Sequence, residues 1–180
     1  MKPALFLDLD GTVIVTKSGK TFPENTDDWQ FNGKILEQMY FYVLKGYAII
    51  IVTNQGGVKS GYITREQLNT KLHNIGQAIL SHIKKHNDNV ILQITASLND
   101  DYNRKPLPGM AYWAARKHEL DLSQSIMVGD ASGLDGNFSD SDLQFARNAG
   151  IPFYIDIKDF LSPTYWDNIY LDHHNLIEKQ

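Results

Sequence analysis

Two aspartates separated by one residue stand in the segment Asp8-Leu9-Asp10-Gly11-Thr12. Residues at positions i and i+2 of a strand face the same way, so these two carboxylates can reach one substrate group. One carboxylate can attack a phosphoryl group as a nucleophile, while the other protonates the leaving oxygen and later takes a proton from water. The pair therefore indicates two-step phosphoryl transfer, although an ordinary turn is an equally good interpretation of this fragment alone.

Other polar residues offer the groups that such a reaction needs, because a phosphoryl group in transfer carries negative charge. Mg²⁺ prefers oxygen ligands, which makes Asp130 the expected additional metal ligand. Lys105 is expected to hold the phosphate and offset the carboxylates, and Thr53 and Asn54 offer a hydroxyl and amides. Singly, these residues can be a turn residue, a surface charge or a helix cap. Their joint occurrence favours one site.

Short apolar runs alternate with helical patterns along the chain. The expected strands cover residues 5–7, 49–52, 91–95, 126–128 and 153–155, and the expected helices cover 35–44, 65–85, 108–120 and 140–149. This alternation predicts an α/β fold with a Rossmann-like, mostly parallel five-stranded sheet and helices on both faces. Ligands of such sheets bind at the carboxyl ends of the strands, where all the polar residues above fall.

The length predicts one domain over residues 1–162, followed by a tail over 163–180 that packs on it or extends from it. The irregular stretch 12–28 is too short for a large cap domain and is expected to form a hairpin flap. The apolar runs are too short to cross a bilayer, and no membrane partner is expected. The formal net charge of -4 argues against broad adhesion to nucleic acid or anionic membranes. Without cysteine or a signal peptide, a cytoplasmic monomer is expected.

The order of these polar segments resembles the four motifs of the haloacid dehalogenase superfamily. The resemblance implies that Asp8 is the nucleophile, Asp10 the acid/base and Thr53 a phosphate ligand. It also implies that Lys105 stabilises the phosphate, and that Asp8, Asp130 and the backbone carbonyl of Asp10 bind Mg²⁺. A second acidic residue often follows the last motif, for which Asp135 is suitably spaced and Asp142 is the rival.

Longer segments resemble the polynucleotide kinase 3'-phosphatase family more specifically. They include residues 17–23, Asp28-Trp29, 53–57, 103–106 with Gly109-Met110, and 138–153. The resemblance implies removal of a 3'-terminal phosphate from DNA. The basic residues expected near the rim, where they could contact backbone phosphates, are Lys17, Lys20, Lys59, Arg65 and Arg104. Phe22 and Tyr62 could stack on a terminal base or simply pack against the protein.

The chain departs from the family pattern in two ways. It has no Gly-x-x-x-x-Gly-Lys-Ser/Thr phosphate loop, so kinase activity is not expected. The segment Gly133-Leu134-Asp135-Gly136-Asn137 carries no positive charge where relatives are often basic, which suggests weaker duplex binding or a preference for frayed or single-stranded ends. The expected partners are nicked, single-stranded or frayed DNA 3' ends. The alternative functions are a histidinol-phosphate or heptose-bisphosphate type phosphatase and a non-catalytic module that binds DNA ends.

Overall fold

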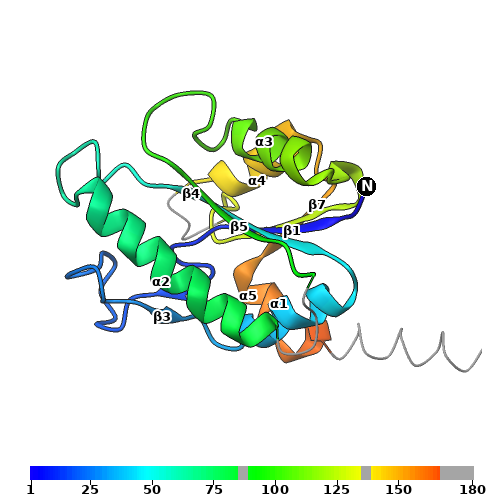
Figure 1. Ribbon diagram of the computed structural model, residues 1–180, viewed down its shortest axis with the longest axis horizontal. Helices are drawn as coiled ribbons and strands as arrows, with labels where there is room; N and C mark the ends of the chain where they lie inside the picture. The colour runs from blue at the N-terminus through cyan, green and yellow to red at the C-terminus, as the bar shows by residue number, and fades with distance from the viewer. Residues whose placement is uncertain (85–88, 135–138, 167–180) are drawn as a thin grey trace, which may run out of the picture.

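The computed structural model describes residues 1–84, 89–134 and 139–166 and is built around a five-stranded sheet (Figure 1). The strand order is β5-β4-β1-β6-β7, and every neighbouring pair is parallel. The strands are β1 (Ala4–Leu7), β4 (Ala48–Asn54), β5 (Leu92–Ser97), β6 (Ile126–Gly129) and β7 (Phe153–Asp156). The predicted α/β class and strand positions are thus confirmed. β5 begins and ends slightly later than expected.

Helices cover both faces of this sheet (Figure 1). One face carries α1 (Ile35–Leu44), α2 (Arg65–Ile83) and α5 (Ile157–Phe160), and the other carries α3 (Gly109–His118) and α4 (Ser141–Ala149). A short 3₁₀ turn, η1 (Leu122–Gln124), precedes β6. Helix α2 begins at a capping box in which Thr64 and Gln67 satisfy each other's backbone amides, and α4 ends at Gly150 in the left-handed conformation. Helix α3 is shorter than predicted, because the left-handed Glu119 ends it before Leu120.

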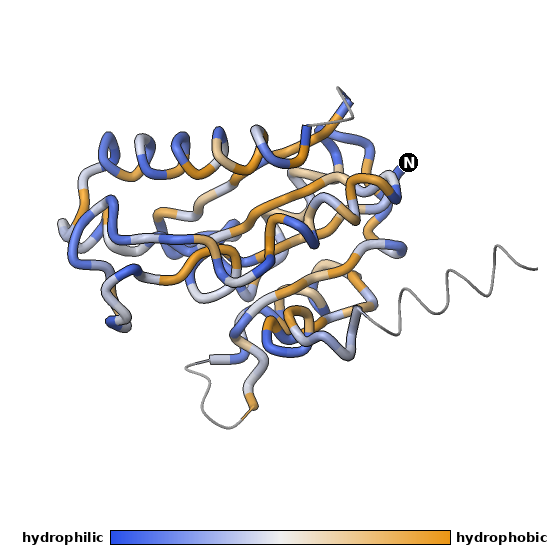
Figure 2. The backbone as a smooth tube through the Cα atoms, turned by 90° about the horizontal axis from the view of Figure 1, so that it is seen from below, coloured by the Kyte–Doolittle hydropathy of each residue, from blue (hydrophilic) through white to orange (hydrophobic). Residues whose placement is uncertain are grey.

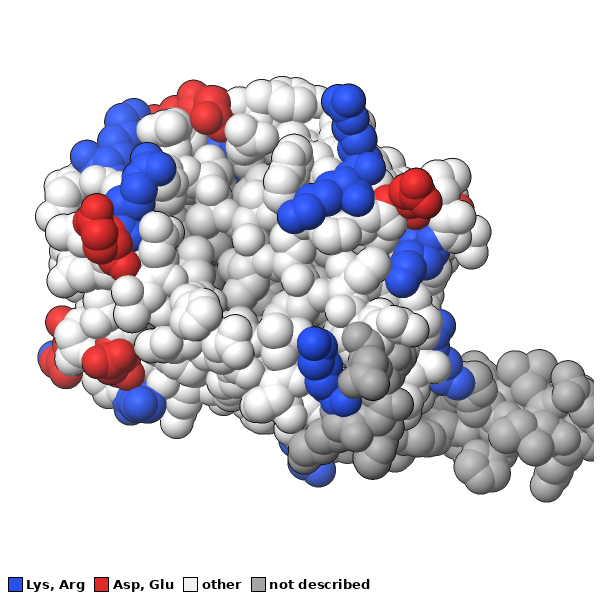
Figure 3. Space-filling view, in the orientation of Figure 1, with Lys and Arg blue, Asp and Glu red and all other residues white. Residues whose placement is uncertain are grey.

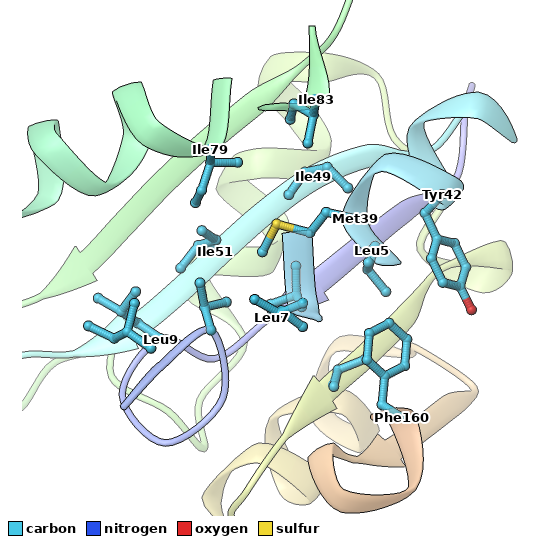
Figure 4. Packing of buried hydrophobic residues seen from close by; sticks show 14 of the residues in the cluster. Leu5, Leu7, Leu9, Met39, Tyr42, Ile49, Ile51, Ile79, Ile83 and Phe160 are labelled. Atoms are coloured by element: carbon cyan, nitrogen blue, oxygen red, sulfur yellow. The ribbon is translucent and has the colours of Figure 1, made fainter. Parts of the chain in front are cut away.

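Alternate residues of the central strands enter two separate hydrophobic cores. Leu5 and Leu7 of β1 pack with α1, α2 and α5 (Figure 4), whereas Ala4 and Phe6 pack with α3 and α4. The tube in Figure 2 is correspondingly apolar along the central strands. Because both faces of β1 and β4 are covered, these strands are apolar at every position up to their carboxyl ends. Polar residues therefore follow directly at the carboxyl ends of these strands, and they line the candidate site.

A two-stranded hairpin takes the place of a large cap domain. β2 (Ile14–Val15) and β3 (Gln30–Phe31) pair antiparallel, and the loop between them carries the residues of the predicted flap. The Asp28 carboxylate organises this loop by accepting hydrogen bonds from the Ser18 amide, the Ser18 hydroxyl and the Glu24 amide at 2.7 to 2.8 Å. The Tyr62 hydroxyl donates to the Pro23 carbonyl at 2.7 Å, so the flap is tied to the loop that follows β4.

The beginning of the predicted C-terminal tail packs against the domain. The Tyr165 hydroxyl lies 2.9 Å from that of Tyr42, and the Trp166 indole donates to the Phe160 carbonyl at 2.8 Å. The boundary at residue 162 remains a prediction, because residues 167–180 lie outside the described part of the chain.

No helix within the described ranges is long and apolar enough to cross a membrane.

Candidate active site

A crevice of about 510 Å³ opens at the carboxyl ends of β1, β4 and β6. Seven of the predicted site residues line it: Asp8, Asp10, Thr53, Asn54, Lys105, Asp130 and Asp142. They come from positions far apart in the sequence and meet because parallel strands end at the same edge of the sheet. The structure therefore brings together the residues expected to carry chemistry. Their individual roles remain predictions.

Asp8 follows β1 directly and is buried against Lys105. The Lys105 ammonium donates to Asp8 Oδ1 at 2.5 Å and to Asp142 Oδ1 at 2.7 Å. Asn54 fixes the backbone of Lys105, since its side chain accepts from the Lys105 amide and donates to the Lys105 carbonyl, both at 2.9 Å. Asn54 was predicted to bind phosphate, and in this structure its amide is used to hold the lysine loop in place.

Three carboxylates converge on the metal site predicted from the sequence. Oxygen atoms of Asp8, Asp130 and Asp142 all lie within 4.8 Å of one another. Asp142 is buried in the first turn of α4 and belongs to this cluster, and its role as the second acid of the motif remains a prediction. Asp135, the other candidate, lies outside the described residues. A Cβ atom at Gly129 would lie only 2.3 Å from Asp142 Oδ2, so this close approach requires glycine.

The crowding of acids around one ammonium changes the protonation of the site. Burial is the largest cause that raises the pKa of Asp8 from 3.8 to about 7, with the charge of Lys105 opposing it and that of Asp142 adding to it. Burial and then Asp142 likewise raise the pKa of Asp130 to about 6. Burial alone lowers the pKa of Lys105, but the facing carboxylates of Asp8 and Asp142 outweigh it and the pKa lies above its ordinary value. The site thus gathers more negative than positive charge, which a divalent cation would offset.

The Asp10 carboxylate lies apart from these three acids and has its own partners. Gln55 Nε2 donates to Asp10 Oδ2 at 2.6 Å, and Lys71 Nζ donates to Asp10 Oδ1 at 3.2 Å. The same Gln55 amide donates to the Thr53 hydroxyl at 2.9 Å. Sequence reasoning missed Lys71. The signal was present, because Lys71 lies three residues after Leu68 and four before Ile75, on the apolar stripe of its helix.

Several basic residues predicted to lie near the rim of the crevice are paired with acidic side chains. Lys20 pairs with Glu24, Lys59 lies 2.7 Å from Asp100, and Arg104 lies 3.2 Å from the same carboxylate. On the face shown in Figure 3, basic and acidic side chains are interspersed. Lys17, Lys20 and Arg104 do not line the crevice itself, so their contact with substrate remains a prediction. Phe22 and Tyr62 are both largely exposed and not packed in the core.

The raised pKa values predict how stability depends on pH. Between about pH 4 and pH 7 the folded chain binds more protons at Asp8 and Asp130 than the unfolded chain does. This contribution to stability is complete below about pH 4 and is lost as the pH rises through the folded-state values. We therefore expect the melting temperature in EDTA to fall from about pH 5 to about pH 8.

Mg²⁺ should reverse much of this loss, because it binds the ionised carboxylates and stabilises the folded state more at high than at low pH. Thermal melts of the wild type and Asp130→Asn, each with EDTA or Mg²⁺, check this. The difference in melting temperature between the two proteins cancels the contribution of the titrating groups that they share. A wild-type melting temperature in EDTA that rises with pH relative to Asp130→Asn would contradict the expectation.

The parallel sheet of this order, the two aspartates after its first strand and the buried lysine beside a three-acid cluster define a phosphatase of the haloacid dehalogenase superfamily. The family model described as "Polynucleotide kinase 3 phosphatase" matches residues 3–160. The chain belongs to this family, as its sequence motifs predicted.

Two curated relatives are similar to this chain over most of its length. The chain is 30% identical to the bifunctional polynucleotide phosphatase/kinase of Schizosaccharomyces pombe over 91% of its own length and 39% of that protein. It is 38% identical to an uncharacterized 20.8 kDa protein of Autographa californica nuclear polyhedrosis virus, over 82% of this chain and 79% of the viral one.

Among solved structures, D,D-heptose 1,7-bisphosphate phosphatase from B. bronchiseptica, complexed with magnesium and phosphate, is similar. It is 26% identical with a TM-score of 0.66, over 86% of this chain and 80% of that one. The chain is also 27% identical to a heptose-1,7-bisphosphate 7-phosphatase of Helicobacter pylori over 87% of this chain and 92% of that protein.

Proposed function

We propose that this protein is a Mg²⁺-dependent phosphatase that removes 3'-terminal phosphates from DNA through an aspartyl-phosphate on Asp8. The observation that carries the reaction is the arrangement of Asp8, buried 2.5 Å from the Lys105 ammonium and beside two further carboxylates. The substrate is proposed from the family match over residues 3–160.

The donor set suits Mg²⁺, which prefers oxygen ligands and takes few carboxylates. Asp8 and Asp130 would hold the ion together with the backbone carbonyl of Asp10, and Asp142 lies within reach of the same position. When bound, the ion neutralises negative charge on the phosphoryl group. Lys105 contributes a fixed positive charge beside Asp8 and Asp142, because its raised pKa keeps it protonated at neutral pH.

The first half of the reaction forms a bond between an Asp8 carboxylate oxygen and phosphorus while the bond from phosphorus to the 3'-oxygen breaks. Asp10 gives its proton to that oxygen, so the DNA leaves with a 3'-hydroxyl. In the second half, a water molecule gives a proton to the Asp10 carboxylate and attacks phosphorus. The bond to Asp8 breaks, inorganic phosphate leaves, and both aspartates return to their starting states.

The form of the crevice supports a polymer terminus as substrate. A hairpin takes the place of a large cap domain, so a strand could enter without being enclosed. The relative from S. pombe, a bifunctional polynucleotide phosphatase/kinase, is 30% identical to this chain over 39% of its own length, which supports a polynucleotide substrate. Because Lys20, Lys59 and Arg104 are paired with acidic side chains, we expect the protein to act better on frayed or single-stranded ends than on nicks in duplex DNA.

The test compares release of phosphate from oligonucleotides that carry it at the 3' end, at the 5' end or internally, each with Mg²⁺ and with EDTA. We expect turnover of the 3'-phosphate alone, only with Mg²⁺, and faster on single-stranded than on nicked substrates. Equal turnover of 5'-phosphates would refute the polarity, and turnover in EDTA would refute the metal requirement.

The second candidate substrate is a sugar bisphosphate, which the heptose-bisphosphate phosphatases among the relatives favour. The same assay therefore includes heptose 1,7-bisphosphate and histidinol phosphate. A higher kcat/KM on either small molecule than on the 3'-phosphorylated oligonucleotide would replace the DNA proposal and leave the chemistry at Asp8 unchanged.

A further inference from the structure

Lys71 is a buried lysine on the apolar face of α2. Its side chain is only 7% exposed, and its helical neighbours on the same stripe, Leu68 and Ile75, belong to the buried residues of the helix. Burying an ammonium group costs free energy unless it gains a partner of opposite charge. A buried cation that an apolar residue could replace indicates a role other than packing.

The partner of Lys71 is the expected acid/base. Lys71 Nζ lies 3.2 Å from Asp10 Oδ1, and Gln55 Nε2 lies 2.6 Å from Asp10 Oδ2. Gln55 uses its other amide hydrogen for the Thr53 hydroxyl at 2.9 Å. Both carboxylate oxygens of Asp10 therefore accept a hydrogen bond, one from Lys71 in α2 and one from Gln55 in the segment after β4.

This restraint matters because the Asp10 side chain is 49% exposed and would otherwise rotate in solvent. Proton transfer requires the carboxylate to stay within hydrogen-bond reach of the leaving oxygen and then of the attacking water. A shift of about 1 Å in a reacting group can cost up to about 100-fold in rate.

We propose that Lys71 is a positioning residue that holds the Asp10 carboxylate in the orientation needed for proton transfer in both halves of the reaction. The inference rests on the aspartyl-phosphate mechanism proposed above but not on DNA as the substrate. It can therefore be tested with p-nitrophenyl phosphate, which has no nucleic-acid part.

The first experiment compares Lys71→Met, Lys71→Arg and the control Lys84→Met, which removes an exposed lysine at the other end of the same helix. We expect Lys71→Met to lower kcat about tenfold and KM along with it, because slowed hydrolysis of the aspartyl-phosphate then limits turnover. Lys71→Arg should restore most of the rate, and Lys84→Met should match the wild type. The melting temperature of Lys71→Met should not fall, because methionine fills the apolar stripe and removes a buried charge.

A purely structural role for Lys71 predicts the opposite pattern. Lys71→Met would then melt at a lower temperature, while its folded fraction would turn over substrate at the wild-type kcat. That result would overturn the inference, as would failure of Lys71→Arg to exceed Lys71→Met.

The second experiment asks whether Lys71 acts through Asp10. Nitrophenolate is a good leaving group that needs little protonation, whereas hydrolysis of the aspartyl-phosphate still needs Asp10 as a base. Lys71→Met should therefore show a burst of nitrophenolate before a slower steady state. In Asp10→Asn, adding Lys71→Met should change the single-turnover rate less than twofold.

Independent, multiplying effects of the two substitutions would overturn the inference. If the wild type itself releases no phosphate from any phosphomonoester, the proposed mechanism fails, and the role of Lys71 fails with it. A wild type that is active on p-nitrophenyl phosphate but not on DNA would overturn only the proposed substrate.

Discussion

Asp8→Asn is expected to lower the rate of phosphate release by about 10⁵-fold, because an amide cannot form the phosphorylated intermediate. The substitution keeps the shape of a residue that lies in a tightly packed position next to Lys105. It also removes the carboxylate whose burial raises its own pKa to about 7, so the variant is expected to fold. The loss should therefore be one of chemistry and not of structure.

The measurement is acid-quenched trapping of phosphate on the protein, followed by identification of the labelled residue. The wild type should carry the label on Asp8, and Asp8→Asn should carry none. Asp121→Asn is the matched control, since Asp121 accepts hydrogen bonds at the start of η1 and takes no part in the crevice. Activity of Asp8→Asn near that of the control would refute the mechanism and revive the interpretation of this domain as a module that only binds DNA ends.

Lys105→Met has the second largest expected effect and should impair both activity and stability. The ammonium lies 2.5 Å from Asp8 and 2.7 Å from Asp142, so its loss leaves buried carboxylates without a counter-charge. Removing one partner from a buried ion pair lowers the free energy of unfolding by about 3 kcal/mol. Loss of a preorganised charge at the reacting group lowers kcat by about 10³-fold.

Denaturant unfolding and steady-state kinetics measure the two effects, with and without Mg²⁺. The ion should recover part of the stability, because it supplies positive charge to the same carboxylates, but it should not restore kcat. Lys117→Met, which removes an exposed lysine that lies over the Trp113 ring, is the control for charge alone. If Lys105→Met were as active as this control, Lys105 would have no part in stabilising the phosphoryl group.

Local sequence patterns predicted most of the fold because these elements depend on local chemistry. The β-branched run of β4 and the apolar stripe of α2 each match one regular period, and the residues of the capping box at the start of α2 lie only three positions apart. Parallel strands must end at one edge, so the meeting of Asp8, Thr53 and Asp130 could be predicted without coordinates. The length of α3 could not be predicted, because its end depends on the left-handed backbone at Glu119.

By itself, the sequence determined the α/β class, the nucleophile candidate and the set of polar residues at the strand ends, all of which follow from local periodicity and strand direction. Only the tertiary structure decided which groups touch. In the folded protein Lys105 donates a hydrogen bond to Asp142, Asn54 hydrogen-bonds the backbone of Lys105, and Lys71 donates to Asp10. These contacts join residues 37, 51 and 61 positions apart. Their formation depends on how helices pack on the sheet, and no periodicity within one segment carries that information.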